Sequence, residues 1–218
     1  MDRSKPVISF PLASKAGALR KGNRSFELFL TSIVAAANFA VSLYIAPMLS
    51  IIIPKVFLGA FIMVPLNLCL SSFVWATTKK KMFTIYFVIY GLLAMPTTIW
   101  GSTPGVFKPL LGAAIGVSLD LITDWLKPEE KKAKYIVGVI FPLIWWALTG
   151  ITWAVVGLPI VQIFQAMLGS VPALKPIAQM GFAMTFVTIA LITIPSSVVA
   201  IHLAVMLSNR VKRDLPIP

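Results

Sequence analysis

The chain has 218 residues, of which 58% are hydrophobic and only 12% are charged. Soluble domains average about 45–50% apolar and about 25% charged residues, so this composition excludes a disordered chain and argues against a soluble domain. With one cysteine and one histidine, the sequence offers no internal disulfide, no His or Cys cluster for a metal and no catalytic triad. We therefore expect a membrane protein that is not an enzyme and has no catalytic residues, metal or cofactor.

Six apolar stretches follow one another along the chain, each near the 20 residues or so that a membrane-spanning helix needs. They cover residues 28–53, 56–76, 82–100, 110–126, 135–157 and 180–207. None alternates with the two-residue period of a membrane β-strand. The sequence predicts an all-α integral membrane protein in which a six-helix membrane domain, 26–209, lies between a basic segment, 1–25, and a basic tail, 210–218.

The basic residues are distributed unevenly between the connections. Sixteen of the 19 Lys and Arg residues fall in the N-terminal segment, the second and fourth connections and the tail, and the exceptions are Lys55, Lys108 and Lys175. Basic residues favour the cytoplasmic side of a membrane protein. The pattern predicts six transmembrane helices in the cell membrane with both termini cytoplasmic, and it explains the net charge of +12 without nucleic acid.

The connections predicted to lie outside are apolar and rich in Gly and Pro. The longer one, 158–179, is either a short helical lid over the outer mouth of the bundle or an interfacial extension of the fifth helix. It contains Gln162 and Gln165, and Asn38 and Asn67 lie within helices. Such amides can orient an uncharged or zwitterionic molecule.

Tryptophans on the fifth helix form the most informative pattern. Trp146, Thr149 and Trp153 follow the spacing that places residues on one helix face. An indole deep in the membrane needs a partner for its N–H group or a flat molecule to stack on. The face is therefore part of a small-molecule pocket or, alternatively, a lipid-facing or core surface.

Two carboxylates and the histidine are the candidates for ion coupling. Asp120 and Asp124 are one turn apart near the predicted cytoplasmic end of the fourth helix. Solvation at the helix end or pairing with a nearby lysine is favoured over coupling. His202, in the sixth helix, is interpreted as a packing or interfacial residue.

Small residues with four-residue spacing occur on two helices. Ala36 and Ala40 lie on the first, and Gly112 and Gly116 on the fourth. This spacing lets helix backbones approach closely, either inside the bundle or against a partner. A phosphate-binding loop is absent from the sequence, so ATP-driven work would need another subunit.

Together, the helix number, the alanine pair, the apolar outer loops and the segment 101–116 (GSTPGVFKPLLGAAIG) leading into Asp120 resemble the substrate-binding S component of energy-coupling-factor vitamin transporters. The resemblance implies a subunit that binds a vitamin or vitamin precursor near the outer surface. It also implies that Ala36 and Ala40 dock a transmembrane coupling subunit driven by two ATPase subunits. On the third helix, Gly91 and Ala94 match the family's small residues imperfectly.

Combining the resemblance with the aromatic face gives a predicted substrate site. Its members are Trp100, Lys108, Trp146, Thr149, Trp153, Gln162 and Gln165, with Lys108 available for one carboxylate or phosphate of the ligand. Two other classes of function stay open. One is a self-contained facilitator or ion-coupled carrier, in which Asp120 would act. The other is a structural or assembly membrane protein, or an enzyme whose catalytic residues the sequence does not reveal.

Overall fold

The computed structural model describes residues 24–53, 55–78, 81–97, 99–100, 103–128, 130–156, 175–179 and 181–214, together with Ala166, Gly169 and Pro172. Within these residues the regular elements are helices, which confirms the predicted all-helical fold. They are α2 (Arg24–Leu49), α3 (Lys55–Leu58), the π-helix η1 (Gly59–Met63), α4 (Val64–Thr78), α5 (Phe83–Ala94), α6 (Phe107–Thr123), α7 (Lys131–Val156), α9 (Lys175–Gln179) and α10 (Phe182–Asp214).

Four helical segments are long and apolar enough to cross a membrane. They are Arg24–Leu49, Gly59–Thr78, Lys131–Val156 and Ala183–Asp214, at the first, second, fifth and sixth predicted stretches. Their outward surfaces carry large apolar side chains, such as Tyr44 and Val155, which are 71% and 75% exposed. An apolar surface of this kind suits lipid rather than water. The described helices therefore indicate a membrane location.

The third predicted helix is wrong in length. A helix was expected over 82–100, but α5 has 12 residues and ends at Ala94. At 1.5 Å per residue it is about 18 Å long, short of a hydrocarbon core of about 30 Å. Pro96 has no N–H group to continue the helical hydrogen bonds, and the amide of Thr97 donates three residues back, to the carbonyl of Ala94. With α6 at 17 residues, the count of six complete crossings stays a prediction.

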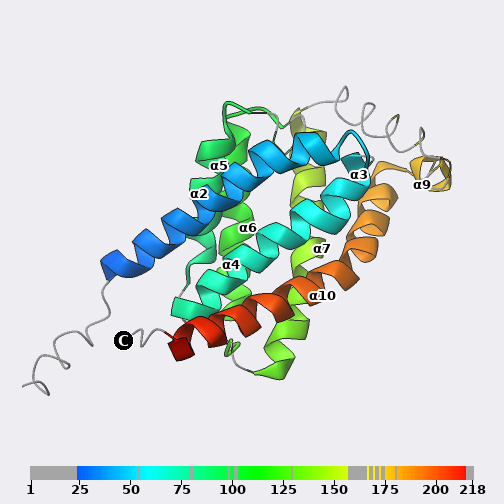
Figure 1. Cartoon of the computed structure of the whole chain (residues 1–218). Helices are drawn as coiled ribbons and strands as arrows, with labels where there is room; N and C mark the ends of the chain where they lie inside the picture. The colour runs from blue at the N-terminus through cyan, green and yellow to red at the C-terminus, as the bar shows by residue number, and fades with distance from the viewer. Residues whose placement is uncertain are drawn as a thin grey trace, which may run out of the picture.

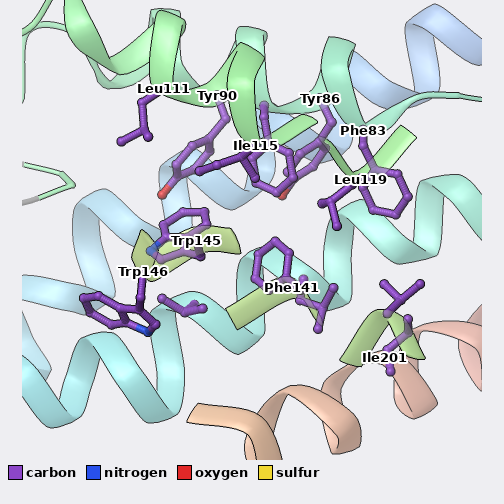
Figure 2. Close-up of a cluster of buried hydrophobic side chains, with 14 of the residues drawn as sticks. Phe83, Tyr86, Tyr90, Leu111, Ile115, Leu119, Phe141, Trp145, Trp146 and Ile201 are labelled. Carbon is purple, nitrogen blue, oxygen red and sulfur yellow. The ribbon is translucent and has the colours of Figure 1, made fainter. Parts of the chain in front are cut away.

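Six helices contact one another in a closed ring. Going round it, α2 contacts α4, α4 contacts α10, α10 contacts α7, α7 contacts α6, α6 contacts α5, and α5 contacts α2. In Figure 1, α2, α4 and α10 run side by side in one layer, and α5, α6 and α7 cross behind them. The buried aromatic residues of α5 and α7 fill the space between the layers (Figure 2).

Prolines shape the helices without ending most of them. Pro142 and Pro195 lie inside the continuous helices α7 and α10. Pro65 follows η1, where the Val64 amide donates to the carbonyl of Gly59, five residues earlier. Because proline has no N–H and clashes with the preceding turn, the widened π-turn accommodates it.

One end of the bundle, which we call the basic end, collects most of the described Lys and Arg residues. There α2 begins, α4 ends and α6 ends, since Arg24, Trp75 and Lys127 line one cleft. The end of α10 joins them, because Lys212 Nζ donates to the carbonyl of Ala76 at 2.5 Å. Both described chain ends thus lie at the same end of the bundle (Figure 1). The grouping follows the predicted loop pattern, and the side of the membrane it faces stays a prediction.

Candidate functional site

The predicted aromatic face of α7 is buried against α10. Trp146, Thr149 and Trp153 are 6%, 5% and 8% exposed. The indole Nε1 of Trp146 donates to Thr193 Oγ1 at 3.1 Å, and that of Trp153 donates to Thr103 Oγ1 at 2.8 Å. Each indole therefore already has the protein partner that a buried tryptophan needs.

Phe186 of α10 lies between these two indoles. Its ring centroid is 6.1 Å from that of Trp146 and 5.8 Å from that of Trp153. A Cβ atom on Gly150 would come within 3.1 Å of the Phe186 ring. Such a close fit is typical of a helix–helix interface. The structure brings the three predicted residues of α7 together, as a packing surface whose rings contact Phe186.

Trp100 lies apart from this surface, beside Trp145. Its ring centroid is 5.4 Å from those of both Tyr90 and Trp145. Figure 2 shows the Trp145 ring turned toward Tyr90 and the Trp146 ring turned away. The backbone of Trp100 has a φ of 65°, in the left-handed region that bulky residues rarely adopt. Strain of this kind gathers at binding and catalytic sites.

Five buried polar side chains from α2, α4 and α5 lie next to these rings, and we call them the polar cluster: Asn38, Ser42, Asn67, Tyr86 and Tyr90. Asn38 Nδ2 donates to Asn67 Oδ1 at 2.8 Å and to the Tyr86 hydroxyl at 2.7 Å. The Tyr90 hydroxyl donates to Ser42 Oγ at 2.9 Å. All five are at most 1% exposed, so the cluster is shielded from lipid.

The hydrogen bonds fix how the Asn38 amide points. Asn67 Nδ2 donates to the carbonyl of Met63 at 2.9 Å, so Asn67 presents its oxygen to Asn38. Asn38 therefore donates this hydrogen bond through its NH2 group, and its own Oδ1 accepts none in the part of the chain that the structure describes. Among the described residues, four buried side-chain atoms have no hydrogen-bond partner: Asn38 Oδ1, Trp100 Nε1, Ser72 Oγ and Ser197 Oγ. The first two belong to the polar cluster and to the ring beside it.

A leftover acceptor and a leftover donor are unfavourable in a closed interior. Burying such a group without a partner costs about 1–3 kcal/mol. The rings of Tyr90 and Trp145 lie beside Trp100, and Asn38 is joined to them through Tyr86, whose ring stacks on that of Tyr90 at 6.5 Å. The surroundings are aromatic with a few polar atoms, as in small-molecule sites. We therefore take Asn38, Tyr90, Trp100 and Trp145 as the centre of the candidate site.

Sequence reasoning placed only Trp100 of this centre among the site residues. The signal that was available is a matched spacing. Asn38 and Ser42 are four residues apart on α2, and Tyr86 and Tyr90 are four apart on α5. Residues at this spacing share a helix face, so two polar faces were present in the sequence. That the two faces meet depends on the contact between α2 and α5.

Lys108 has a different environment from the one expected. It is 1% exposed, and its Nζ donates to the carbonyl of Ala94 at 2.9 Å and to the carbonyl of Thr97. These carbonyls lie at and just after the C-terminus of α5, where a cation is favoured by the helix dipole. A ligand anion would have to displace these bonds, so Lys108 positions α5 rather than facing an open site.

Asp120 holds the opposite end of α5. Its Oδ1 accepts from the amide of Phe83 at 3.2 Å, and its Oδ2 accepts from the amide and hydroxyl of Thr84 at 2.9 and 2.6 Å. The favoured interpretation, solvation or a lysine pair, is therefore wrong for Asp120, which caps a helix N-terminus. It is right for Asp124, whose Oδ2 is 2.5 Å from Lys81 Nζ.

The glycines of α6 pack against α5 inside the bundle. A Cβ atom on Gly112 would overlap the carbonyl of Phe87, and one on Gly116 would overlap the backbone of Thr84. One on Gly91 of α5 would lie 2.7 Å from the carbonyl of Lys108. These glycines allow α5 and α6 to touch backbone to backbone, which selects bundle packing over partner docking for Gly112 and Gly116.

The alanines of α2 are on the outside. Ala36 and Ala40 are exposed, whereas the inward face of the same helix is polar and includes Thr31 and Asn38. His202 is also exposed, on α10. Gln162 and Gln165 lie outside the described residues, as does most of the predicted lid, of which α9 is one described part.

Comparisons with known proteins give no family. The sequence matches no protein-family model, and the chain matches no curated protein and no solved structure. In the described part of the chain, no group of three or more His, Cys, Asp or Glu side chains is placed to hold a metal ion.

Proposed function

We propose that the protein is a membrane-embedded binding subunit that captures a small vitamin or vitamin precursor for import by a partner energising module. The observation that carries this proposal is the pair of buried, unpartnered atoms, Asn38 Oδ1 and Trp100 Nε1, beside aromatic rings. An acceptor and a donor of this kind suit a flat, uncharged or zwitterionic molecule with an N–H and a carbonyl or ring nitrogen.

The proposal of a partner is supported by α2 and by the sequence. The glycines of α5 and α6 pack against the backbone of the facing helix and are therefore not available to a partner. We assign the docking of a coupling subunit to the exposed pair Ala36 and Ala40 on α2. The sequence lacks a phosphate-binding loop, so another subunit would have to supply the energy, and the resemblance implies two ATPase subunits in that role. We place this complex in the cell membrane, with both termini cytoplasmic.

The alternative of an ion-coupled carrier receives less support. It needs a carboxylate that exchanges ions during transport. Asp120 accepts three hydrogen bonds from the start of α5, so its carboxylate is already used to hold that helix. A carrier that releases Asp120 would have to uncap α5 in every cycle.

Native mass spectrometry tests ligand binding. The protein is extracted in mild detergent from the membranes of its own host, and the mass of any bound small molecule is read directly. Trp100→Phe removes the leftover donor and is expected to weaken the adduct about tenfold, equivalent to about 1.4 kcal/mol. The control is Trp146→Phe, since that indole already bonds to Thr193. Equal adducts in both variants would disprove the assigned site.

Partner docking is tested separately in the same extracts. Ala40→Trp is expected to abolish copurification of a coupling subunit and its ATPases while the small-molecule adduct remains. The matched control is Ala114→Trp, at an exposed alanine of α6. Loss of partners in both variants, or in neither, would contradict docking through α2.

A further inference from the structure

A cleft of about 790 Å³ lies at the basic end of the bundle. It is bounded by the first turn of α2, the last turn of α4, the start of α5 and the segment that follows α6, with Trp75 and Met82 among its walls. Its size is within the range of about 300–1,000 Å³ that small-molecule sites occupy. The polar cluster and Trp100 do not line it.

Three of the five charged residues of the cleft are basic, an excess of one positive charge. Arg24, Lys81 and Lys127 line it together with the acidic Glu27 and Asp124. Lys81 and Asp124 form an ion pair at 2.5 Å and so largely neutralise each other. Arg24 and Lys127 are both exposed. The cleft therefore carries a net positive charge and favours an anion.

Apart from Thr123, the remaining walls are apolar. Leu28, Ile85 and Leu126 line the cleft alongside Trp75. Leu28 is 39% exposed, and its neighbour Phe29 is 63% exposed on α2. An apolar path thus leads from the cleft onto the surface of a helix that is long and apolar enough to lie in lipid. A ligand that fits these surroundings has an anionic head and an apolar tail.

We propose that this cleft binds the phosphate headgroup of an anionic membrane lipid. Arg24 and Lys127 contact the phosphate, and the first part of an acyl chain lies against Leu28 and Ile85. Basic residues at the membrane surface attract anionic lipid headgroups, and here they stand beside an apolar wall rather than alone. The site is independent of the proposed vitamin site.

The test is a lipid titration by native mass spectrometry on the full chain. Wild-type protein in detergent is titrated with phosphatidylglycerol and, separately, with phosphatidylcholine of the same acyl chains. We expect phosphatidylglycerol to bind at least about tenfold more tightly. The double variant Arg24→Gln/Lys127→Gln is expected to remove most of this preference. The control, Lys132→Gln/Arg213→Gln, makes the same charge change at exposed residues outside the cleft and should keep it.

Three results would overturn the proposal. Equal loss in both double variants would indicate diffuse attraction to the basic end, and no loss in the Arg24/Lys127 variant would remove the cleft from the interaction. Glycerol phosphate binding as tightly as the lipid would indicate a soluble phosphate compound. Because the basic residues are exposed, the double variants should fold. In addition, Leu28→Asn should weaken the lipid and leave glycerol phosphate unaffected.

Discussion

α5 is held by two neighbours in different ways. Toward α6, the backbones touch at Gly91, Gly112 and Gly116, and Asp120 and Lys108 satisfy the two ends of α5. Toward α2, polar side chains hydrogen-bond across the contact, and one atom of Asn38 is left without a partner among the described residues.

We interpret the α5–α6 contact as stabilising the fold and the α5–α2 contact as part of the proposed binding site. At the first contact every polar group named above is used by another part of the protein, so substitutions there should act on stability. At the second contact hydrogen-bonding capacity is left over, which a folded protein tolerates best where a ligand supplies the missing partner. We therefore expect stability and ligand binding to respond to different halves of the α5 surface.

The largest effect should come from filling the contact between α5 and α6. In Gly112→Val the new side chain overlaps the carbonyl of Phe87, so the helices must separate. We expect destabilisation of about 3 kcal/mol or more, or no folded protein. Thermal unfolding in detergent measures it. Gly181→Val is the control, since a Cβ there meets nothing within 4 Å; similar losses in both variants would refute the proposed close contact.

Removing the carboxylate that caps the start of α5 should have the next largest effect. Asp120→Ala leaves the amides of Phe83 and Thr84 without their acceptor, and we expect a loss of about 2 kcal/mol. Ser118→Ala, which removes a hydroxyl bonded only within its own helix, should change the melting temperature little. If Asp120→Ala instead retained full stability and abolished transport, the carrier hypothesis would replace ours.

Two tryptophan variants compare a bonded indole with an unpartnered one through the stability of the ligand-free protein. Trp146→Phe loses the hydrogen bond to Thr193, whereas Trp100→Phe removes a donor that has no partner among the described residues. The first should therefore cost about 1 kcal/mol more than the second in the unfolding of ligand-free protein. An equal or larger loss for Trp100→Phe would mean that its indole N–H is satisfied in the membrane.

The smallest effect should be at the surface pair of the basic end. Lys81 and Asp124 are 61% and 34% exposed in their side chains, so Asp124→Asn should cost less than about 1 kcal/mol. The loss should shrink further at 1 M salt, where the screening length is about 3 Å. A loss as large as that of Asp120→Ala would show that this pair also holds α5.

The sequence predicted an all-helical fold, and four of its six predicted stretches are long apolar helices in the structure. It also predicted that basic residues gather on one side. These features depend on local composition. The sequence overestimated the third helix, since an apolar run does not reveal where the chain turns back after Ala94. It also assigned Trp146 and Trp153 to a ligand, because the spacing that gathers residues on one face does not say whether Phe186 covers that face.

What the sequence alone determined, then, is a chain that must bury its backbone in helices and place its basic residues at one end of a membrane bundle. Only the tertiary structure decided which polar side chains have hydrogen-bond partners within the protein. Lys108 and Asp120 lie 12 positions apart in the chain, and the antiparallel contact of α6 with α5 puts them at the two ends of one short helix. The same folding brought Asn38 beside Tyr86 and left one of its atoms without a partner among the described residues, because side-chain pairing depends on contacts between helices far apart in the sequence.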